Sequence, residues 1–369
     1  MKNKIAFGSW EATALMVNLV FAQIMMNFPG DMVRFGGSAG WIISIIITLI
    51  AIGYFAIIVM LYKNIGSLDL IDISEAIGGR PFKTIVGLLI SILLILIVSF
   101  FMGAFSQTIK IISLDKSPIE FVEVFFFIAI IIAGYFGIEA VVRINAILVP
   151  ILILGFILIT LGVIPQFKVN NLFPILGLGS TSIAKGSIMK LAAFGSFIIL
   201  FLMVPFFKKR YLKKVGFSYI VISGVLLLWS TLSFILVFPY EVAVNKRIPI
   251  FEMTRQIEFG NFVQRVESIF VLICSLCLLM FLCVVFNFVV YIFAKTFDLK
   301  RLRPIILPLA IIVFSLSRIS IKWNIDLIGY NMKTLIWLIG MILPLIIIII
   351  GAAKRVGTKD EGGINHGQK

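Results

Sequence analysis

The sequence has little charge, and most of that charge lies outside its long apolar runs. Charged residues make up 13% of the chain and hydrophobic residues 61%, whereas a soluble domain is nearer a quarter charged and half apolar. Runs such as AGWIISIIITLIAIGYFAIIVMLY and LIWLIGMILPLIIIIIGAA are long enough to cross a bilayer core of about 30 Å as helices. The composition therefore excludes an ordinary soluble domain and predicts an all-α polytopic protein embedded in the lipid bilayer.

Histidine and cysteine are also scarce. His366, in the tail, is the only histidine, and Cys274, Cys277 and Cys283 all lie in one apolar stretch. The spacing in CSLC is that of a redox or metal-binding pair, but no second pair accompanies it, and we interpret these cysteines as small buried side chains. The apolar runs lack paired carboxylates as well, which leaves acid–base or metal catalysis few groups to use. We therefore predict no enzyme, no metal site and no cofactor.

The net charge is +15. A basic balance can indicate nucleic-acid binding, but the Lys and Arg residues lie mainly between apolar runs, which favours a topological role and no nucleic-acid partner. The densest basic segments are KKRYLKK (208–214) and KTFDLKRLR (295–303), and placing both inside puts the N and C termini in the cytoplasm. We predict ten transmembrane helices, at roughly 10–34, 39–62, 82–112, 118–136, 141–163, 186–207, 216–239, 263–294, 303–319 and 332–353.

Ten spans divide into two sets of five. We expect a first five-helix repeat over residues 1–163, a second over 164–353, and a polar, glycine-rich cytoplasmic tail over 354–369 that is disordered. Because five is odd, the second unit would face the opposite way across the membrane. Such an inverted repeat is typical of secondary transporters, which bind substrate at mid-membrane between interrupted helices. The division therefore predicts that helices 1 and 6 are interrupted.

The first span carries the unusual stretch MVNLVFAQIMMNFPGDM. In an unbroken helix Asn18 and Gln23 would point about 140° apart, and a break between them would turn both amides toward one cavity. Amides also hold helices together in lipid, and this alternative remains open for Asn18 and Asn27. Local chemistry alone would end the helix at Pro29-Gly30.

The centre of the sixth span, Ala192-Ala193-Phe194-Gly195-Ser196, contains four small residues, one of them a glycine. The span's sequence AFGSFIILFLMVPFFKK resembles the sixth span of endospore germination permeases, the B subunits of nutrient germinant receptors within the amino acid–polyamine–organocation superfamily. FGSWEATALMVNLVFAQIMMNFPGDMVRFGGSAGWI resembles their opening helix, and VNNLFPILGLGSTSIAKGSI resembles the loop before their sixth span. IPIFEMTRQIEFGNFVQRVESIFV is similar to their outer amphipathic helix and the start of span eight. The resemblance covers almost the whole chain in order.

This resemblance implies a LeuT-like fold with helices 1 and 6 unwound near mid-membrane. Carried onto this sequence, it places the breaks at Phe21-Ala22-Gln23-Ile24 and Ala193-Phe194-Gly195-Ser196, and we expect these eight residues to bind the substrate. The chain departs from its relatives in two ways. Phe21 and Gln23 stand where relatives commonly have glycine, and the sixth span lacks the glutamate that some relatives carry. The second departure weakens the case for proton-driven transport through that carboxylate.

Unwound turns in a membrane leave N–H and C=O groups that must face a cavity. The half-helix starting near Ile24 would present a positive end that suits a carboxylate, and the freed carbonyls suit an ammonium group. We therefore expect the ligand to be a small nutrient, an amino acid. Spans three and eight would close the pocket through some of the following residues: Ser99, Met102 or Ser106, and Cys277, Phe281 or Asn287.

The resemblance implies a receptor subunit of the spore inner membrane, whose partners are the A subunit and the lipoprotein C subunit. Nutrient binding would shift an outward/inward equilibrium and trigger germination. The alternative function is a secondary amino acid transporter, coupled to ions or protons. The two functions share one fold and one site, so flux through the chain alone is what separates them.

Overall fold

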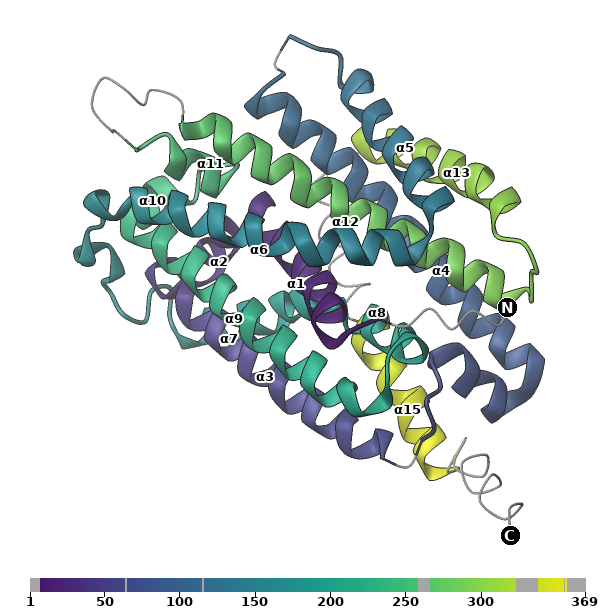
Figure 1. The fold of residues 1–369 in the computed structure, drawn as a ribbon. Coiled ribbons are helices and arrows are strands. Elements are labelled where there is room, and N and C mark those ends of the chain that lie inside the picture. The colour runs from purple at the N-terminus through teal and green to yellow at the C-terminus, as the bar shows by residue number, and fades with distance from the viewer. Residues whose placement is uncertain are drawn as a thin grey trace.

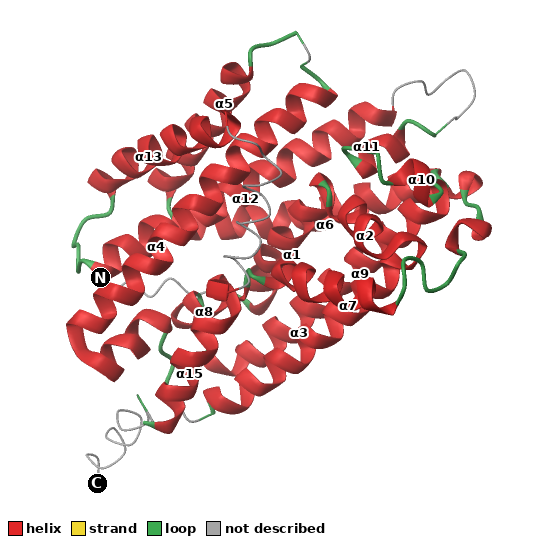
Figure 2. Ribbon diagram, turned by 180° about the vertical axis from the view of Figure 1, so that it is seen from behind, coloured by secondary structure: helices red, strands yellow, loops and turns green. Residues whose placement is uncertain are grey.

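The computed structural model describes residues 7–63, 65–114, 116–257, 266–322, 338–354 and 356. Over these ranges the chain is helical and contains no β-strand (Figures 1 and 2). The elements in chain order are α1 (Ser9–Met26), α2 (Phe28–Gly36), η1 (Gly37–Ala39), α3 (Gly40–Tyr62), α4 (Leu70–Ile112), α5 (Ile119–Phe136), α6 (Ile138–Gly162), η2 (Ile164–Gln166), η3 (Val169–Leu172), α7 (Ser180–Lys190), η4 (Leu191–Phe194), α8 (Phe197–Leu202), η5 (Val204–Phe206), η6 (Lys209–Tyr211), α9 (Leu212–Val237), α10 (Tyr240–Ala243), α11 (Pro249–Thr254), α12 (Val266–Thr296), α13 (Arg303–Lys322), η7 (Leu338–Ile342) and α15 (Leu343–Ala353).

The described helices form a multi-pass membrane bundle. Among the described residues, seven helical stretches are long and apolar enough to cross a membrane, and a shorter apolar helix covers Ile339–Ala353. The peripheral helices α5 and α6 expose large apolar side chains, among them Phe125, Phe136, Ile147 and Leu158. Exposed apolar surface on this scale is suited to lipid rather than to water. The count of ten spans and the division at residues 163 and 164 stay predictions, and parts of predicted spans eight and ten (263–265 and 332–337) lie outside the described residues.

Helix α1 lies near the centre of the bundle (Figure 1). It packs against α6, α9 and α12, and every residue from Ala12 to Ala22 is buried. A helix that is apolar on all sides is stable only where neighbours surround it. This central position brings the end of α1 to the sixth span, because α1 also contacts η4.

The first span is interrupted at Asn27. This residue has φ −143° and ψ 11°, outside the helical region, and it separates α1 from α2. Pro29 lies in the first turn of α2, where its missing N–H is tolerated, whereas inside a continuous helix it would remove a bond and clash with the preceding turn. The predicted break at Phe21–Ile24 is therefore wrong, since these residues lie within α1. The local signal of Pro29-Gly30 located the break better than the family resemblance did.

The sixth span is interrupted where the sequence predicted. Helix α7 ends at Lys190, η4 forms a short 3₁₀ turn, and α8 begins at Phe197. The amide of Gly195 donates to the carbonyl oxygen of Ala192 at 2.9 Å, which is the three-residue spacing of a 3₁₀ turn. The predicted break at Ala193–Ser196 falls within this interruption.

The ends of the described chain meet the same side of the bundle. The amide of Phe7 donates to the carbonyl oxygen of Phe206 at 2.8 Å, and that of Gly66 donates to the carbonyl oxygen of Val356 at 3.1 Å. Both contacts lie beside the loops that we predict to be cytoplasmic. In the predicted tail, residue 355 and residues 357–369 lie outside the described residues.

Candidate functional site

The last turn of α1, just before the first interruption, is joined to the interruption of the sixth span by a hydrogen bond. The Nε2 group of Gln23, near the end of α1, donates to the carbonyl oxygen of Ala193 in η4 at 3.1 Å. A longer contact of 3.5 Å joins the same group to the carbonyl oxygen of Leu19, one turn earlier in α1. Within a membrane, backbone carbonyls must find donors inside the protein. The structure therefore brings one residue of each predicted set into direct contact.

The other predicted residues of the first span pack into the core. Phe21, Ala22 and Ile24 are each 0% exposed. The ring of Phe21 meets the ring of Phe156 in α6 edge-on, with centroids 5.5 Å apart. Gln23 keeps some exposed surface. Among these four residues, it is the Gln23 side chain that forms a hydrogen bond with the sixth span.

The predicted residues of the sixth span contact spans seven and ten. The hydroxyl of Ser196, which is half-buried, lies 2.7 Å from the hydroxyl of Tyr219 in α9. Phe194 is fully buried and packs against the rings of Phe197 and Tyr219. Gly195 is backed by Gly340 of η7, where a Cβ would lie 2.8 Å from the Gly195 carbonyl oxygen. Gln23 and Ser196 are therefore the polar members of the predicted set that retain accessible surface.

Span eight reaches span one through Cys277. Its thiol donates to Oδ1 of Asn18 at 3.3 Å, and both residues are 0% exposed. The Nδ2 group of Asn18 is buried and has no partner among the described residues. Asn18 thus holds helices together, as the alternative interpretation of the amides expected.

The remaining candidates from spans three and eight mostly bond within their own helices. Ser99 and Ser106 donate to carbonyl oxygens four residues earlier in α4, and Asn287 does the same in α12. Met102 is fully buried, and Phe281 packs against the rings of Phe101 and Phe105. The ring contacts of Phe281 thus join α12 to α4.

Two charged residues beside the interruptions were not recognised from the sequence. Asp31, in the first turn of α2, and Lys190, the last residue of α7, form an ion pair. Their side chains are 13% and 7% exposed. The pair joins the second half of the first span to the first half of the sixth span, across 159 residues of sequence. In the sequence, each of the two interrupted apolar runs carries one of these charges, and this could have drawn attention to them. Their pairing, however, depends on the tertiary fold.

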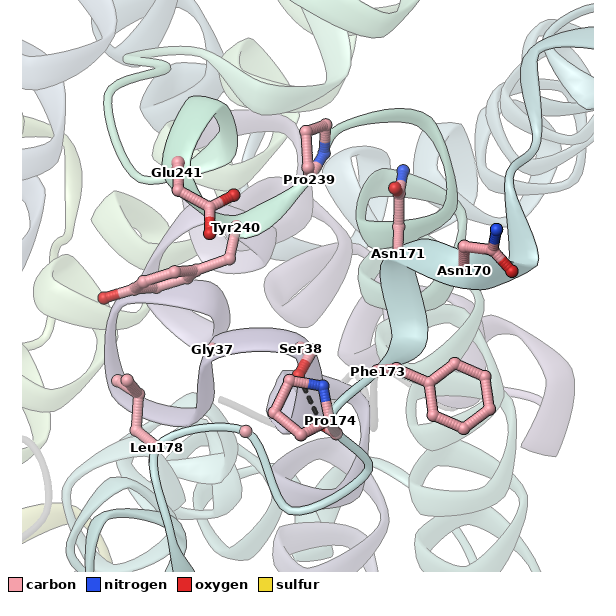
Figure 3. A pocket seen from close by; sticks show the side chains of 11 residues that line it. Gly37, Ser38, Asn170, Asn171, Phe173, Pro174, Leu178, Pro239, Tyr240 and Glu241 are labelled. Carbon is pink, nitrogen blue, oxygen red and sulfur yellow. Dashed lines mark hydrogen bonds between the residues drawn. The ribbon is translucent and has the colours of Figure 1, made fainter.

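A pocket lies beside the C-terminal end of α2 (Figure 3). Its volume is about 270 Å³, and the loop Asn170–Leu178 forms one wall. The hydroxyl of Ser38 donates to the carbonyl oxygen of Pro174 at 2.5 Å, and the amide of Leu178 donates to that of Gly36 at 3.3 Å. The loop before the sixth span is thus fastened to the end of the first interrupted span. The lining residues are Gly37, Ser38, Asn170, Asn171, Phe173, Pro174, Gly177, Leu178, Pro239, Tyr240 and Glu241.

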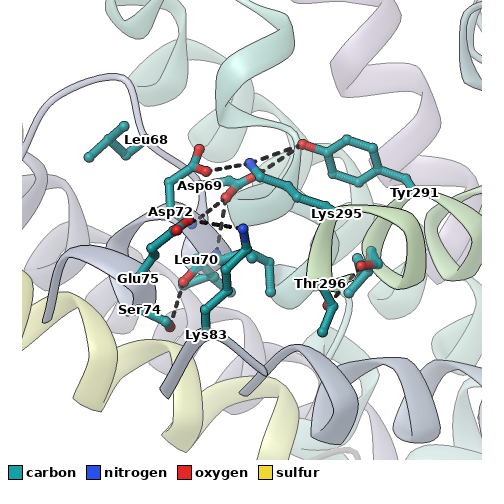
Figure 4. A network of polar contacts seen from close by, with 12 residues as sticks. Leu68, Asp69, Leu70, Asp72, Ser74, Glu75, Lys83, Tyr291, Lys295 and Thr296 are labelled. Atoms are coloured by element: carbon teal, nitrogen blue, oxygen red, sulfur yellow. Dashed lines mark hydrogen bonds and ion pairs between the residues drawn. The ribbon is translucent and has the colours of Figure 1, made fainter. Parts of the chain in front are cut away.

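An ion-pair network closes the opposite side of the bundle (Figure 4). Asp69 is fully buried and caps α4 by accepting from the amides of Ile71 and Asp72. Its other oxygen accepts from Nζ of Lys295 at 2.5 Å and from the hydroxyl of Tyr291 at 2.8 Å. Lys295 also pairs with Asp72 at 2.7 Å. The network thus binds the start of α4 to the end of α12.

Lys83 extends the network after a kink in α4. Gly78 and Gly79 have non-helical dihedral angles, so the first two turns of α4 are set apart from the long helix. Lys83 pairs with Glu75 at 3.0 Å and with Asp298 at 2.7 Å. The hydrogen bond from Lys83 lowers the pKa of the Asp298 carboxyl, which lies in the loop after α12. Charges from three segments therefore meet at this side.

Two interrupted helices that meet inside a helical bundle define a membrane protein of the LeuT-like transporter fold. The structure is similar to that of Mhp1, a nucleobase-cation-symport-1 family transporter solved in a closed conformation with bromovinylhydantoin bound. The TM-score is 0.68 at 10% sequence identity, over 94% of this chain and 78% of that chain. The likeness shows the fold.

The chain belongs to the spore germination protein family, whose sequence profile matches residues 9–324. It is similar to spore germination protein A2 of Bacillus subtilis (strain 168), with 22% identity over 377 residues, which cover 95% of this chain and 97% of that protein. The resemblance to germination permeases is thereby confirmed.

Proposed function

We propose that this chain is the transporter-like membrane subunit of a spore germinant receptor. It binds a small nutrient, an amino acid, between the interruptions of spans one and six, and binding triggers germination. The A and C subunits are its proposed partners, the spore inner membrane its location, and the cytoplasm the side of both termini. The observation that carries the proposal is the hydrogen bond from Gln23 to the Ala193 carbonyl oxygen, which connects the last turn of α1, just before the first interruption, to the second interruption.

The chemistry of the interruptions supports a zwitterionic ligand, which carries a carboxylate and an ammonium group. Helix α2 begins just after Asn27 and directs the positive end of its dipole toward the first interruption. The polar side chains of Gln23 and Ser196 lie beside the second. These groups suit the carboxylate and ammonium of one small molecule. The apolar ring of Phe194 forms part of the surrounding wall.

Replacing Gln23 by leucine tests the placement. The substitution removes the amide and leaves the Ala193 carbonyl oxygen without its donor, a loss worth about 1–3 kcal/mol. We expect saturable binding of labelled L-amino acids to the full chain in lipid nanodiscs to weaken by about tenfold or more. Gln166→Leu is the matched control, because Gln166 is exposed in η2. Equal affinity in wild type, Gln23→Leu and Ser196→Ala would contradict the placement.

A secondary amino acid transporter is the second candidate function. The observation that favours it is Asp31, an ionisable carboxylate buried beside the first interruption, where proton coupling has a group to use. Uptake of labelled amino acid by proteoliposomes containing this chain alone separates the functions. Binding without uptake supports the receptor, and concentrative uptake driven by a pH gradient supports the transporter.

A further inference from the structure

The buried pair of Asp31 and Lys190 is built with several supporting contacts. Asp31 also accepts a hydrogen bond from Nδ2 of Asn27 at 3.3 Å. Lys190 lies over the ring of Phe35, with Nζ 5.3 Å from its centroid. Each of these buried charges stabilises the other, because burying an unpaired charge costs far more free energy than burying an ion pair.

The pair also sits where a ligand's charges would be placed. Asp31 is in the first turn of α2, at the positive end of that helix, and Lys190 ends α7, at its negative end. The carbonyl oxygen of the Asn27 side chain is buried and has no partner among the described residues, so it is available to a donor. The protein thus holds one anion and one cation beside the two interruptions.

We propose that Asp31 and Lys190 are the charge-recognition residues of the site, and that their ion pair takes the place of a zwitterion when no ligand is bound. This inference rests on the proposed function. On binding, the carboxylate of an amino acid pairs with Nζ of Lys190, and its ammonium group pairs with the carboxylate of Asp31. One ion pair is exchanged for two, and no buried charge is left alone. Asn27 Oδ1 accepts a further hydrogen bond from the ammonium group.

Selectivity for zwitterions follows from this exchange. An α-amide of the same amino acid keeps the ammonium group but leaves Lys190 unpaired. An N-acetyl derivative keeps the carboxylate but leaves Asp31 unpaired. Because a site built for a charged partner strongly rejects analogues that lack it, each derivative should bind about a hundredfold more weakly. The exchange also separates α2 from α7, so recognition loosens the contact between the two spans.

The experiment measures binding to the full chain in lipid nanodiscs. Labelled common L-amino acids with uncharged side chains are screened first, and the tightest binder is then compared with its α-amide and its N-acetyl derivative. Wild type should prefer the zwitterion over both by about a hundredfold. Lys190→Gln should prefer the cationic α-amide, and Asp31→Asn the anionic N-acetyl derivative. Lys185→Gln, exposed on the same helix α7, should behave as wild type.

The outcomes separate this inference from the function on which it rests. Wild type that binds no amino acid overturns the proposed function and this inference together. Wild type that binds the zwitterion and either derivative within about tenfold overturns the inference alone, and this comparison requires no variant to fold. Lys190→Gln and Asp31→Asn chains that bind with the wild-type preference overturn it as well. A switch of preference in opposite directions supports it.

Discussion

Replacing Lys295 by methionine is expected to release the start of α4 from α12. Asp69 is fully buried and accepts from Lys295, so the substitution leaves a buried carboxylate without the cation that pairs with it. Breaking a buried ion pair in this way costs about 3–5 kcal/mol. We expect the loss of local opening free energy to lie at the lower end, about 3 kcal/mol. The Lys295 side chain is 21% exposed, and Asp69 keeps its hydrogen bonds from the Ile71 and Asp72 amides.

Hydrogen exchange at the amides of Ile71 and Asp72 measures this effect. A loss of about 3 kcal/mol in local opening free energy makes exchange about a hundredfold faster. Lys295→Arg keeps the charge and should stay within about tenfold of wild type. Lys300→Met, an exposed position in the following loop, is the matched control and should have no effect. Wild-type exchange rates in Lys295→Met would show that the network does not hold this side closed.

Replacing Gly177 by alanine is expected to detach the loop before the sixth span from the end of α2. Gly177 has φ +50°, a conformation that costs other residues about 1–2 kcal/mol. An added Cβ would lie 1.9 Å from the carbonyl oxygen of Gly36, and relieving such overpacking costs about 1–3 kcal/mol. Because the obstructing atom belongs to the backbone, the loop itself must move. We expect the free energy of unfolding in detergent micelles to fall by about 2–4 kcal/mol.

Gly179→Ala isolates the clash from the backbone strain. Gly179 also has a positive φ, +97°, but an added Cβ would meet nothing within 4 Å. Gly179→Ala should therefore lower the free energy of unfolding less than Gly177→Ala does. Exchange of the Leu178 amide, which donates to the carbonyl oxygen of Gly36, should accelerate in Gly177→Ala and change less in Gly179→Ala. Equal effects of the two substitutions would place the cause in strain alone.

The sequence predicted the helical bundle because long apolar runs have few alternatives in a membrane. It also predicted the second interruption, since small residues at Ala192–Ser196 weaken a helix that the family resemblance already marked. The first interruption shows where the resemblance misled. Pro29 enforces a local steric rule, and this rule determined the position of the break more directly than the pattern of distant relatives.

Part of the candidate site depended on information that the sequence does not display. Gln23 and Ala193 were both predicted, and they make contact. Phe21 was also predicted for the site, yet its ring packs against Phe156. Gln23, two positions further along the same helix, points to a different face and therefore meets a different neighbour. Asp31 and Lys190 were missed, since a charge in an apolar run reveals nothing about a partner 159 residues away.

The ion pairs of Lys83 and the ion pair of Asp31 and Lys190 differ in their access to water, and ionic strength should therefore act on them unequally. In the pair of Lys190 and Asp31 both side chains are at least 87% covered, whereas Glu75 and Asp298, which pair with Lys83, are 41% and 61% exposed. Mobile ions screen exposed charges over a Debye length of about 8 Å at physiological salt and reach dry pairs much less. Concentrated salt should therefore weaken the contacts of Lys83 with Glu75 and Asp298 more than it weakens the pair beside the interruptions.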